Sequence, residues 1–258
     1  MKKVTHHTAR ASHYDKDAAL YDTFNEKNSK TINKTLAKIL TKNKVKTVLD
    51  ITCGTGSQVF WLTKRGFKVV GSDINGPMLS VARKKARAQN RVIKFIKSDM
   101  SKVKVGQFDA VIAIFNAIGH LTIKDFAKTI KNAAHNLNNN GLIIFDIFNA
   151  DFLRHKDNIT TFTIDWLKAT ADGSARVIQY STIDDKGIMA SFTTEYTQVA
   201  HNKPKASHSA QTLQVYNASE LCDLLRENGF KVIEQCGIDG TGFKRLKTDR
   251  ILTVARKI

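Results

Sequence analysis

Two glycines and two carboxylates are spaced in this sequence as a nucleoside-binding site requires. Asp50 ends an apolar run, and Gly54 and Gly56 follow it before a helical pattern begins. Glycines, which lack a Cβ, let a ligand approach the backbone closely. Asp73 comes seventeen residues after Gly56, at the end of the next apolar run, where a carboxylate can accept hydrogen bonds from both ribose hydroxyls. The spacing therefore predicts a nucleoside-containing cofactor on an α/β sheet.

The same loop indicates which nucleoside is bound. A dinucleotide site favours a third glycine three residues after Gly56, and Val59 occupies that position. Asp50 would also repel a pyrophosphate. S-adenosylmethionine has an amino group and a sulfonium but no phosphate, so it tolerates this carboxylate. The loop therefore favours S-adenosylmethionine as the cofactor.

Residues 48–56 resemble the first motif of the class I S-adenosylmethionine-dependent methyltransferases, usually Asp-x-x-x-Gly-x-Gly. Further segments resemble the later motifs of that family, in the family's order: 71–74 with 77–79, 98–100, 108–112 and 141–145. Thr52 departs from the pattern, since many members have glycine there. The resemblance covers most of the chain outside residues 151–216, and it implies a methyltransferase.

The resemblance also implies which residues bind the cofactor. Asp99 would hold the adenine amino group, and the next residue would pack on the ring. Two N-terminal tyrosines resemble those that close over the methionine end of the cofactor in one group of the family, with ordinary packing as the alternative. The full expected set is Tyr14, Tyr21, Asp50, Thr52, Gly54, Thr55, Gly56, Asp73, Ile74, Met78, Asp99, Met100, Phe115 and Asn116.

Residues that bind the methyl acceptor should lie after the fourth strand, near 115–121, in the N-terminal segment and within residues 151–216, because ligands of such sheets bind at the carboxyl ends of the strands. Enzymes that methylate exocyclic amines of nucleic-acid bases have an Asn/Asp-Pro-Pro-aromatic motif there, and cytosine-C5 enzymes use a Pro-Cys nucleophile. The chain contains two prolines, Pro77 and Pro204, so it has neither motif.

Residues 116–121 and 213–216 are instead similar to a group of small-molecule methyltransferases. That group includes the amino-sugar N,N-dimethyltransferases and the glycine/sarcosine N-methyltransferases. The resemblance implies a small-molecule methyl acceptor, with an amine nitrogen favoured. His120 is the candidate catalytic residue, as a base or a hydrogen-bond partner of the acceptor. A structural histidine is the alternative.

Alternating apolar runs and helical patterns predict the elements that position these residues. Strands are expected at 46–51, 67–72, 92–97, 108–115 and 142–148. Helices are expected near 28–43, 57–65, 76–89 and 123–137, the last ending at the Asn-Asn-Asn-Gly of 138–141. Continuous apolar strands separated by helices indicate a parallel sheet covered on both faces.

The fold class is therefore α/β, a doubly wound Rossmann-like sheet. A helix at 217–228 and strands at 230–235 and 249–256 complete it. The family resemblance implies seven strands, with the last one antiparallel and inserted between the fifth and the sixth.

Residues 160–216 alternate polar and apolar positions, and 184–187 have the composition of a hairpin turn. They predict an antiparallel β insert of about four strands after the fifth strand. We divide the chain into a methyltransferase core, residues 1–150 and 217–258, and an insert, residues 151–216, which by the resemblance roofs the acceptor pocket. Four aromatic side chains of the insert would line that pocket or pack within the insert: Trp166, Tyr180, Phe192 and Tyr196.

The chain is strongly basic, with 41 Lys and Arg against 23 Asp and Glu and a net charge of +18. Lys30, Lys34, Lys38 and Lys42 recur at helical spacing, opposite an apolar face, and a second basic block covers residues 83–97. Solvated helix faces explain such runs most simply. An RNA or protein methyltransferase, or an RNA-binding protein that keeps the fold, is the alternative function.

Other features narrow the class of protein. Three scattered cysteines predict neither a disulfide framework nor a zinc site, so we expect no metal and a reducing, cytoplasmic compartment. No apolar stretch reaches eighteen residues, so no membrane span is expected, and the first residues do not resemble a signal peptide. The sequence does not decide between N-, O- and C-methylation, nor between a monomer and a homodimer.

Overall fold

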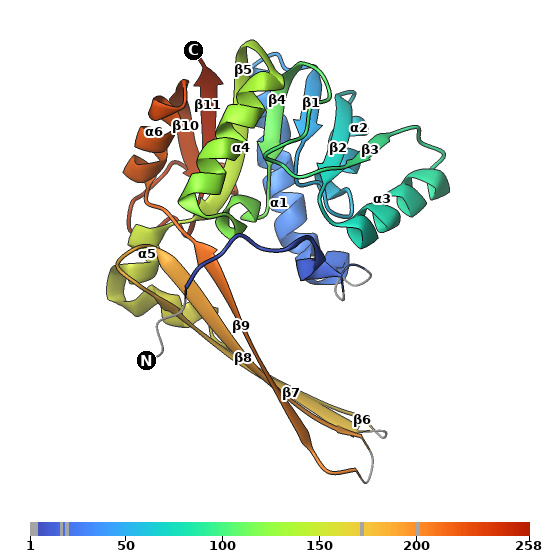
Figure 1. Ribbon diagram of the computed structural model, residues 1–258, viewed down its shortest axis with the longest axis vertical. Helices are drawn as coiled ribbons and strands as arrows, with labels where there is room; N and C mark the ends of the chain where they lie inside the picture. The colour runs from blue at the N-terminus through green and yellow to red at the C-terminus, as the bar shows by residue number, and fades with distance from the viewer. Residues whose placement is uncertain (1–4, 16–17, 19–20, 171–172, 200–201) are drawn as a thin grey trace.

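The computed structural model describes residues 5–15, 18, 21–170, 173–199 and 202–258, with the backbone alone for 13–14, 21–28, 168 and 170. A seven-stranded sheet lies at its centre, in the order β10-β11-β5-β4-β1-β2-β3 (Figure 1). Its strands are β1 (Thr47–Asp50), β2 (Lys68–Asp73), β3 (Lys94–Lys97), β4 (Phe108–Ala113), β5 (Leu137–Phe148), β10 (Phe230–Gly237) and β11 (Arg250–Lys257).

The first five strands pair in parallel, and β11 pairs antiparallel to both β5 and β10. The predicted doubly wound sheet, with an antiparallel last strand between the fifth and the sixth, is confirmed. Because β1 to β4 run in the same direction, the segments that follow them all emerge at one edge of the sheet. The predicted motifs lie in those segments.

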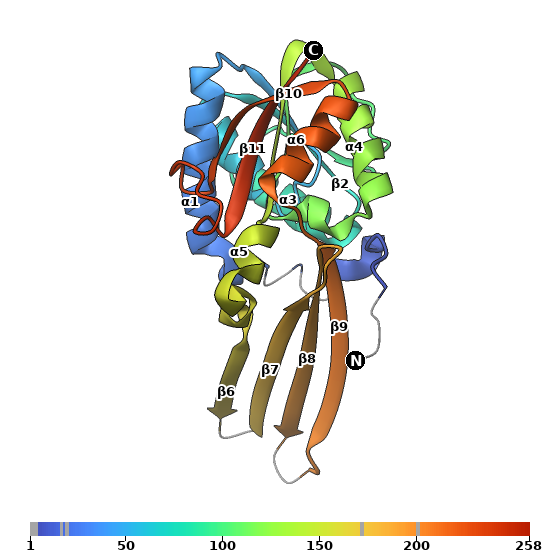
Figure 2. The ribbon, with the colours of Figure 1, turned by 90° about the vertical axis from the view of Figure 1, so that its left-hand side faces the viewer.

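Helices cover both faces of this sheet (Figure 2). α1 (Tyr21–Lys42) and α2 (Ser57–Thr63) pack on one face, and α4 (Ile123–His135) and α6 (Ala218–Glu227) pack on the other. α3 (Gly76–Ala88) packs against β2 and β3. In α1 the expected amphipathic pattern is confirmed, with Lys34 and Lys38 exposed and Ile32 and Leu36 fully buried.

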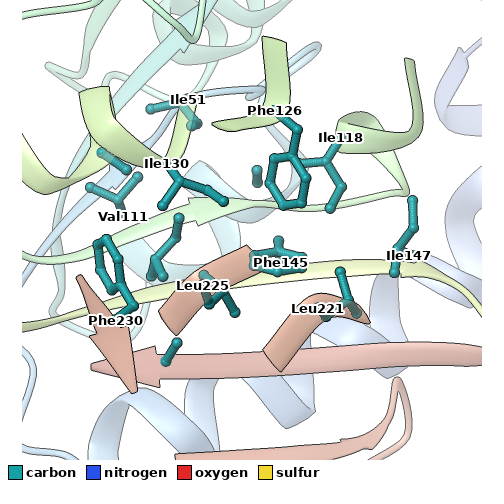
Figure 3. Close-up of a cluster of buried hydrophobic side chains, with 14 of the residues drawn as sticks. Ile51, Val111, Ile118, Phe126, Ile130, Phe145, Ile147, Leu221, Leu225 and Phe230 are labelled. Atoms are coloured by element: carbon teal, nitrogen blue, oxygen red, sulfur yellow. The ribbon is translucent and has the colours of Figure 1, made fainter. Parts of the chain in front are cut away.

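The larger core lies between the sheet and the pair α4 and α6 (Figure 3). Phe126 of α4 meets Phe145 of β5 edge to face, with ring centroids 5.3 Å apart. Leu221 and Leu225 of α6 are fully buried in the same cluster. This packing holds β4 and β5 against the helices that precede and follow the insert.

A four-stranded antiparallel sheet forms the insert, in the order β6-β7-β8-β9. Its strands are β6 (Ile164–Thr170), β7 (Gly173–Ile183), β8 (Ile188–Val199) and β9 (Lys205–Gln214), and it extends away from the core as a single layer (Figures 1 and 2). The turn at 184–187 forms as predicted: the Asp184 carboxylate accepts from the backbone of Lys186 and Ile188, and Gly187 has a φ of +74°.

Two local expectations were wrong. The helix expected near 123–137, with its stop at 138–141, ends at His135, because the Asn136 side chain donates to the carbonyls of Asn132 and Val103 and closes the last turn. β5 then starts at Leu137, which pairs with Phe108.

The segment before the insert sheet is helical, which the sequence pattern did not indicate. α5 (Ala150–Arg154) starts where the Asn149 side chain accepts from Asp151 N, and the 3-10 helix η3 (His155–Phe162) follows. Their apolar side chains pack with Met189 and Val215 at the base of the insert. In the described part of the chain, no helix combines the length and apolar character that a bilayer crossing requires.

Candidate active site

An open cavity lies where β1, β2, β3 and β4 end. Ten of the residues predicted to form the site line it: Thr52, Gly54, Thr55, Asp73, Ile74, Met78, Asp99, Met100, Phe115 and His120. Asp50, Gly56 and Asn116 are not among its described lining residues, but each is next to one in the chain. Tyr14 ends the 3-10 helix η1 (Ala11–Tyr14) and Tyr21 begins α1, while their side chains lie outside the described part.

The loop between β1 and α2 turns on two glycines with positive φ, +50° at Gly54 and +91° at Gly56. A Cβ at Gly56 would lie 2.7 Å from Cε2 of Phe60, whereas one at Gly54 would meet no atom within 4 Å. Gly54 lines the cavity, so its backbone borders space that a ligand can occupy. Its N–H donates to Oδ2 of Asp73 at 2.8 Å, which ties the loop to the end of β2.

Asp50, at the end of β1, is 1% exposed. Its Oδ1 accepts from Thr52 N at 3.1 Å, but its Oδ2 and the Thr52 hydroxyl are buried without a hydrogen-bond partner. Burial raises the pKa of Asp50 to about 8, with a smaller contribution from the Asp73 carboxylate. A cationic ligand group in this cavity would offset the cost of burying the charged carboxylate.

Asp73 and Asp99 lie at the ends of neighbouring strands, β2 and β3. Burial raises the pKa of Asp73, although its oxygens accept from the backbone N–H groups of Gly54 and Asn75. Asp99 accepts from the backbone and hydroxyl of Ser101 through Oδ1, each at 2.7 Å. The two carboxylates give this part of the cavity hydrogen-bond acceptors, which suits hydroxyl and amino donors of a nucleoside.

The turn after β4 brings His120 to the cavity. Phe115 and Asn116 both have positive φ, +69° and +57°, and the 3-10 helix η2 (Ala117–His120) follows them. The His120 carbonyl accepts from Ala9 N at 2.9 Å. The predicted acceptor-side residue and the predicted cofactor loop therefore border one cavity.

The N-terminal segment was expected at the site, through Tyr14 and Tyr21, but the residues of it that line the cavity, Thr8, Ala9, Arg10 and Ala11, were not singled out from the sequence. The His6 ring contacts Thr212 of the insert and the Leu121 carbonyl, at 2.9 and 3.0 Å. Further along, the Asn75 side chain donates to the Ala11 carbonyl at 2.8 Å. Figure 1 shows this segment crossing from the insert to the start of α3, along the edge where the strands end.

Sequence reasoning also missed a polar group between α1 and α2. Gln58 lines the cavity and donates to Oδ1 of Asn33 at 2.9 Å, and Asn33 donates to the Ser57 hydroxyl at 3.3 Å. Both amides are almost fully buried. The sequence offered one signal for this group, a polar residue, Asn33, on the otherwise apolar face of the predicted helix.

None of the described residues of 151–216 lines this cavity. The insert approaches it from behind η2, where a Cβ on Gly119 would lie 3.2 Å from the Gln214 carbonyl. Three of the four aromatic residues considered for the pocket, Trp166, Tyr180 and Tyr196, are 44–53% exposed on the insert strands. The roof over the acceptor stays a prediction. Among the described residues, no three His, Cys, Asp or Glu are grouped as metal ligands would be.

Residues 48–141 match the protein family described as the methyltransferase domain. This segment of the chain is similar to methyltransferase domains. The matched segment contains the glycine loop, Asp73, Asp99 and His120, and the resemblance seen in the motifs is confirmed.

The chain is also similar, over part of its length, to proteins named as glycine N-methyltransferases. It is 32% identical over 120 residues to a glycine/sarcosine N-methyltransferase of Parasynechococcus marenigrum, covering 45% of this chain and 43% of that protein. It is 31% identical over 121 residues to mouse glycine N-methyltransferase, covering 41% of each. The chain thus spans less than half the length of the curated relatives that it matches.

Solved structures share the fold over nearly the whole chain. An S-adenosylmethionine-dependent methyltransferase from Clostridium acetobutylicum has a TM-score of 0.75 at 17% identity, covering 95% of this chain and 98% of that one. The sugar N-methyltransferase KedS8 from Streptoalloteichus has a TM-score of 0.72 at 15% identity, covering 98% and 97%. The fold that these proteins share includes the insert as well as the core.

Proposed function

We propose that the protein transfers the methyl group of S-adenosylmethionine to an amine nitrogen of a small molecule. The observation that carries this proposal is that one cavity is bordered by the glycine loop after β1 and by His120 after β4. A cofactor held by the loop and an acceptor held near His120 would meet inside it.

The residues present fit S-adenosylmethionine. The cavity borders the carboxylates Asp73 and Asp99, and the unpartnered Asp50 Oδ2 lies behind its loop. These carboxyl groups offer hydrogen-bond acceptors, for which a pyrophosphate has no donors, whereas a cation with a ribose and an adenine amine supplies donors for them. Asp73 would take the ribose hydroxyls, Asp99 the adenine amine, and Met78, Met100 and Ile74 the apolar surface of the base and sugar.

When bound, S-adenosylmethionine supplies a methyl group that is already activated by the sulfonium. The protein therefore has to align the acceptor and remove its proton. His120 would accept the proton of a protonated amine, which frees the nitrogen lone pair. The backbone bond from Ala9 to His120 would keep the N-terminal segment over the same end of the cavity and exclude water.

The relatives support an amine as the acceptor class. The glycine/sarcosine enzyme of Parasynechococcus and the sugar enzyme KedS8 are both named as N-methyltransferases. Their acceptors differ in size, so the acceptor of this chain is proposed only as a small amine. The insert would close the acceptor side from behind η2, where Thr212 and Gln214 approach His6 and Gly119.

A panel assay tests the proposal. The protein is incubated with S-adenosylmethionine and glycine, sarcosine, amino sugars, bulk transfer RNA or a mixed protein extract, and S-adenosylhomocysteine and methylated products are measured by mass spectrometry. We expect a methylated small amine. Asp73→Ala serves as the control, because it removes the proposed ribose acceptor. Methylation of RNA or protein alone would contradict the proposal, as would the absence of S-adenosylhomocysteine binding at millimolar ligand.

A further inference from the structure

A buried carboxylate on β5 lies outside the cavity lining and holds the acceptor-side turn from behind. Asp146 has no exposed surface. Its Oδ1 accepts from Phe115 N at 2.7 Å, and its Oδ2 accepts from Asn116 N at 3.2 Å. Two consecutive backbone N–H groups of left-handed residues thus point at one carboxylate, as in an anion-binding nest. This cradle explains how two non-glycine residues in succession adopt positive φ.

Arg250 of β11 compensates the charge of this carboxylate. Its Nε and Nη2 both donate to Asp146 Oδ2, the former at 3.0 Å, and its side chain is only 10% exposed. The guanidinium carbon lies 5.7 Å from the centroid of the Phe115 ring and 5.8 Å from that of Phe148. Arg250 therefore contacts both the carboxylate and the aromatic ring that borders the cavity.

The turn is fixed at a second point by its own side chain. Oδ1 of Asn116 accepts from Phe148 N at 3.0 Å, and the Asn116 carbonyl accepts from Gly119 N at 3.0 Å. A side chain at Gly119 would be crowded, because its Cβ would lie 3.0 Å from Cδ1 of Ile147. The wall from Phe115 to His120 is thus built on β5 and β11, strands that supply no side chain to the described lining.

We propose that Asp146, held by Arg250, is a positioning residue for methyl transfer: it sets the place of Phe115 and, through the turn, of His120. This inference rests on the proposed function, which places a methyl acceptor beside this turn. The position of the turn itself can be measured without any acceptor. Among the described residues, the hydrogen bonds of Asp146 go to Phe115, Asn116 and Arg250 and not to the cofactor loop after β1. Loss of the pair should therefore change alignment at the acceptor side more than cofactor affinity.

Asp146→Asn tests the proposal, because the amide keeps the size of the side chain but turns an NH₂ group toward the donors of Asn116 and Arg250. Hydrogen exchange of the amides of residues 114–121, the affinity for S-adenosylhomocysteine, and kcat and KM for the amine identified by the panel assay are measured. Arg250→Lys, which keeps the charge but not the forked contact, should give an intermediate effect and serves if Asp146→Asn does not fold. Leu225→Ala is the matched control, since it opens a cavity in the same core on α6, away from the turn.

We expect faster exchange at Phe115 and Asn116 in Asp146→Asn and a kcat lower by about tenfold or more, since small misplacements of reacting groups are costly. S-adenosylhomocysteine affinity should change by less than about threefold, and Leu225→Ala should keep normal exchange in the turn. Unchanged exchange in the turn would overturn the proposal, and so would an affinity loss as large as the loss of kcat. If the wild type methylates no amine, the proposed function fails, while the exchange data still decide whether Asp146 positions the turn.

Discussion

His120 places an imidazole in the described lining of the cavity. Whether it acts as a base depends on the protonation state of the acceptor. If the acceptor is an amine that is protonated at neutral pH, a base must remove the proton before attack. His120→Asn keeps a polar side chain of similar size but cannot act as a base. We expect turnover to fall by about ten- to a thousandfold, the range of general acid–base catalysis, with cofactor affinity within a few fold.

The pH dependence separates two roles for His120. As pH rises, bulk water deprotonates more of the amine, so the loss in His120→Asn should shrink if the residue is a base. Rate measurements from pH 6 to 10 decide this. A constant loss across that range would make His120 a positioning residue, and unchanged turnover would make it structural.

Asp50 links the cofactor loop to the stability of the protein. Its pKa is 3.8 in a model peptide and about 8 in the folded protein, because it is buried. Between these values the folded state binds more protons than the unfolded chain. The stabilising contribution of protonated Asp50 is therefore complete below about pH 4 and is lost as pH rises to about 8.

We predict that the free energy of unfolding falls between pH 5 and 8, and that Asp50→Asn flattens this dependence. The amide keeps an acceptor for Thr52 N but carries no charge at any pH. Urea denaturation of both proteins at a series of pH values measures the effect. Asp73, whose pKa is also raised by burial, should leave a residual slope of the same sign in the variant. Equal slopes in the two proteins would show that Asp50 does not titrate as the burial implies.

At the scale of elements, the N-terminal segment connects parts of the chain that carry different halves of the proposed site. The Thr8 hydroxyl donates to Oδ2 of Asp125 at 2.6 Å and accepts from Thr122 N at 3.1 Å, at the start of α4. Hydrogen bonds from the side chains of Lys128 and Thr8 lower the pKa of Asp125 to about 2, and the bond from Lys128 has the larger effect. These bonds therefore fix Thr8, which is itself one of the lining residues of the N-terminal segment, to α4.

Thr8→Val removes both bonds with little change in volume. One hydrogen bond contributes about 0.5–1.5 kcal/mol, so we expect S-adenosylhomocysteine to dissociate about two- to tenfold faster. Stopped-flow displacement measures the rate. The control is Thr161→Val, whose hydroxyl donates to the Asn158 carbonyl in η3, outside the lining. Equal dissociation rates in wild type and Thr8→Val would mean that the segment does not retain the cofactor.

The elements that were predicted well are those whose pattern is local. Apolar runs such as that ending at Asp50 read as buried strands, and the Asn75-Gly76-Pro77 start of α3 carries its own cap. The start of β5 was missed because Leu137 is held by pairing with Phe108, a contact between distant residues. A short helix such as α5 has too few residues to display a period.

The residues of the candidate site also fall into those that local sequence predicts and those that depend on distant partners. Gly54, Asp73 and Asp99 could be predicted because family spacing and strand ends place them. Thr8 could not, since its partner Asp125 is 117 residues away and no pattern links the two. The role of the Asp146 carboxylate was also hidden, because Asp146 lies within an apolar strand and its partner Arg250 comes 104 residues later.

At the scale of the whole molecule, a large share of the excess positive charge lies at one end of the sheet. Residues 83–104 contain nine Lys and Arg and one acidic residue, Asp99, and they form α3, the edge strand β3 and the loop that follows it. Lys94 and Lys97 are exposed on that edge. Lysines on an edge strand hinder pairing with another sheet, so part of this charge has a structural reason. The proposed acceptor side, near His120 at the end of β4, is separated from β3 by β1 and β2.

This separation predicts that the basic surface is not needed for methylation of a small amine. Two sets of charge reversals test it: Lys30, Lys34 and Lys38 to Glu on α1, and Lys84, Arg87 and Lys94 to Glu on α3 and β3. We expect normal S-adenosylhomocysteine affinity and normal turnover of the amine in both, because these side chains lie outside the described lining.

RNA binding by the wild type should be weak and should fall steeply between 50 and about 200 mM salt, as for contacts to phosphates alone. If either set abolishes turnover while the cofactor still binds, the substrate is anionic and reaches the site across that face. The small-amine proposal would then give way to an RNA or another polyanion as the acceptor.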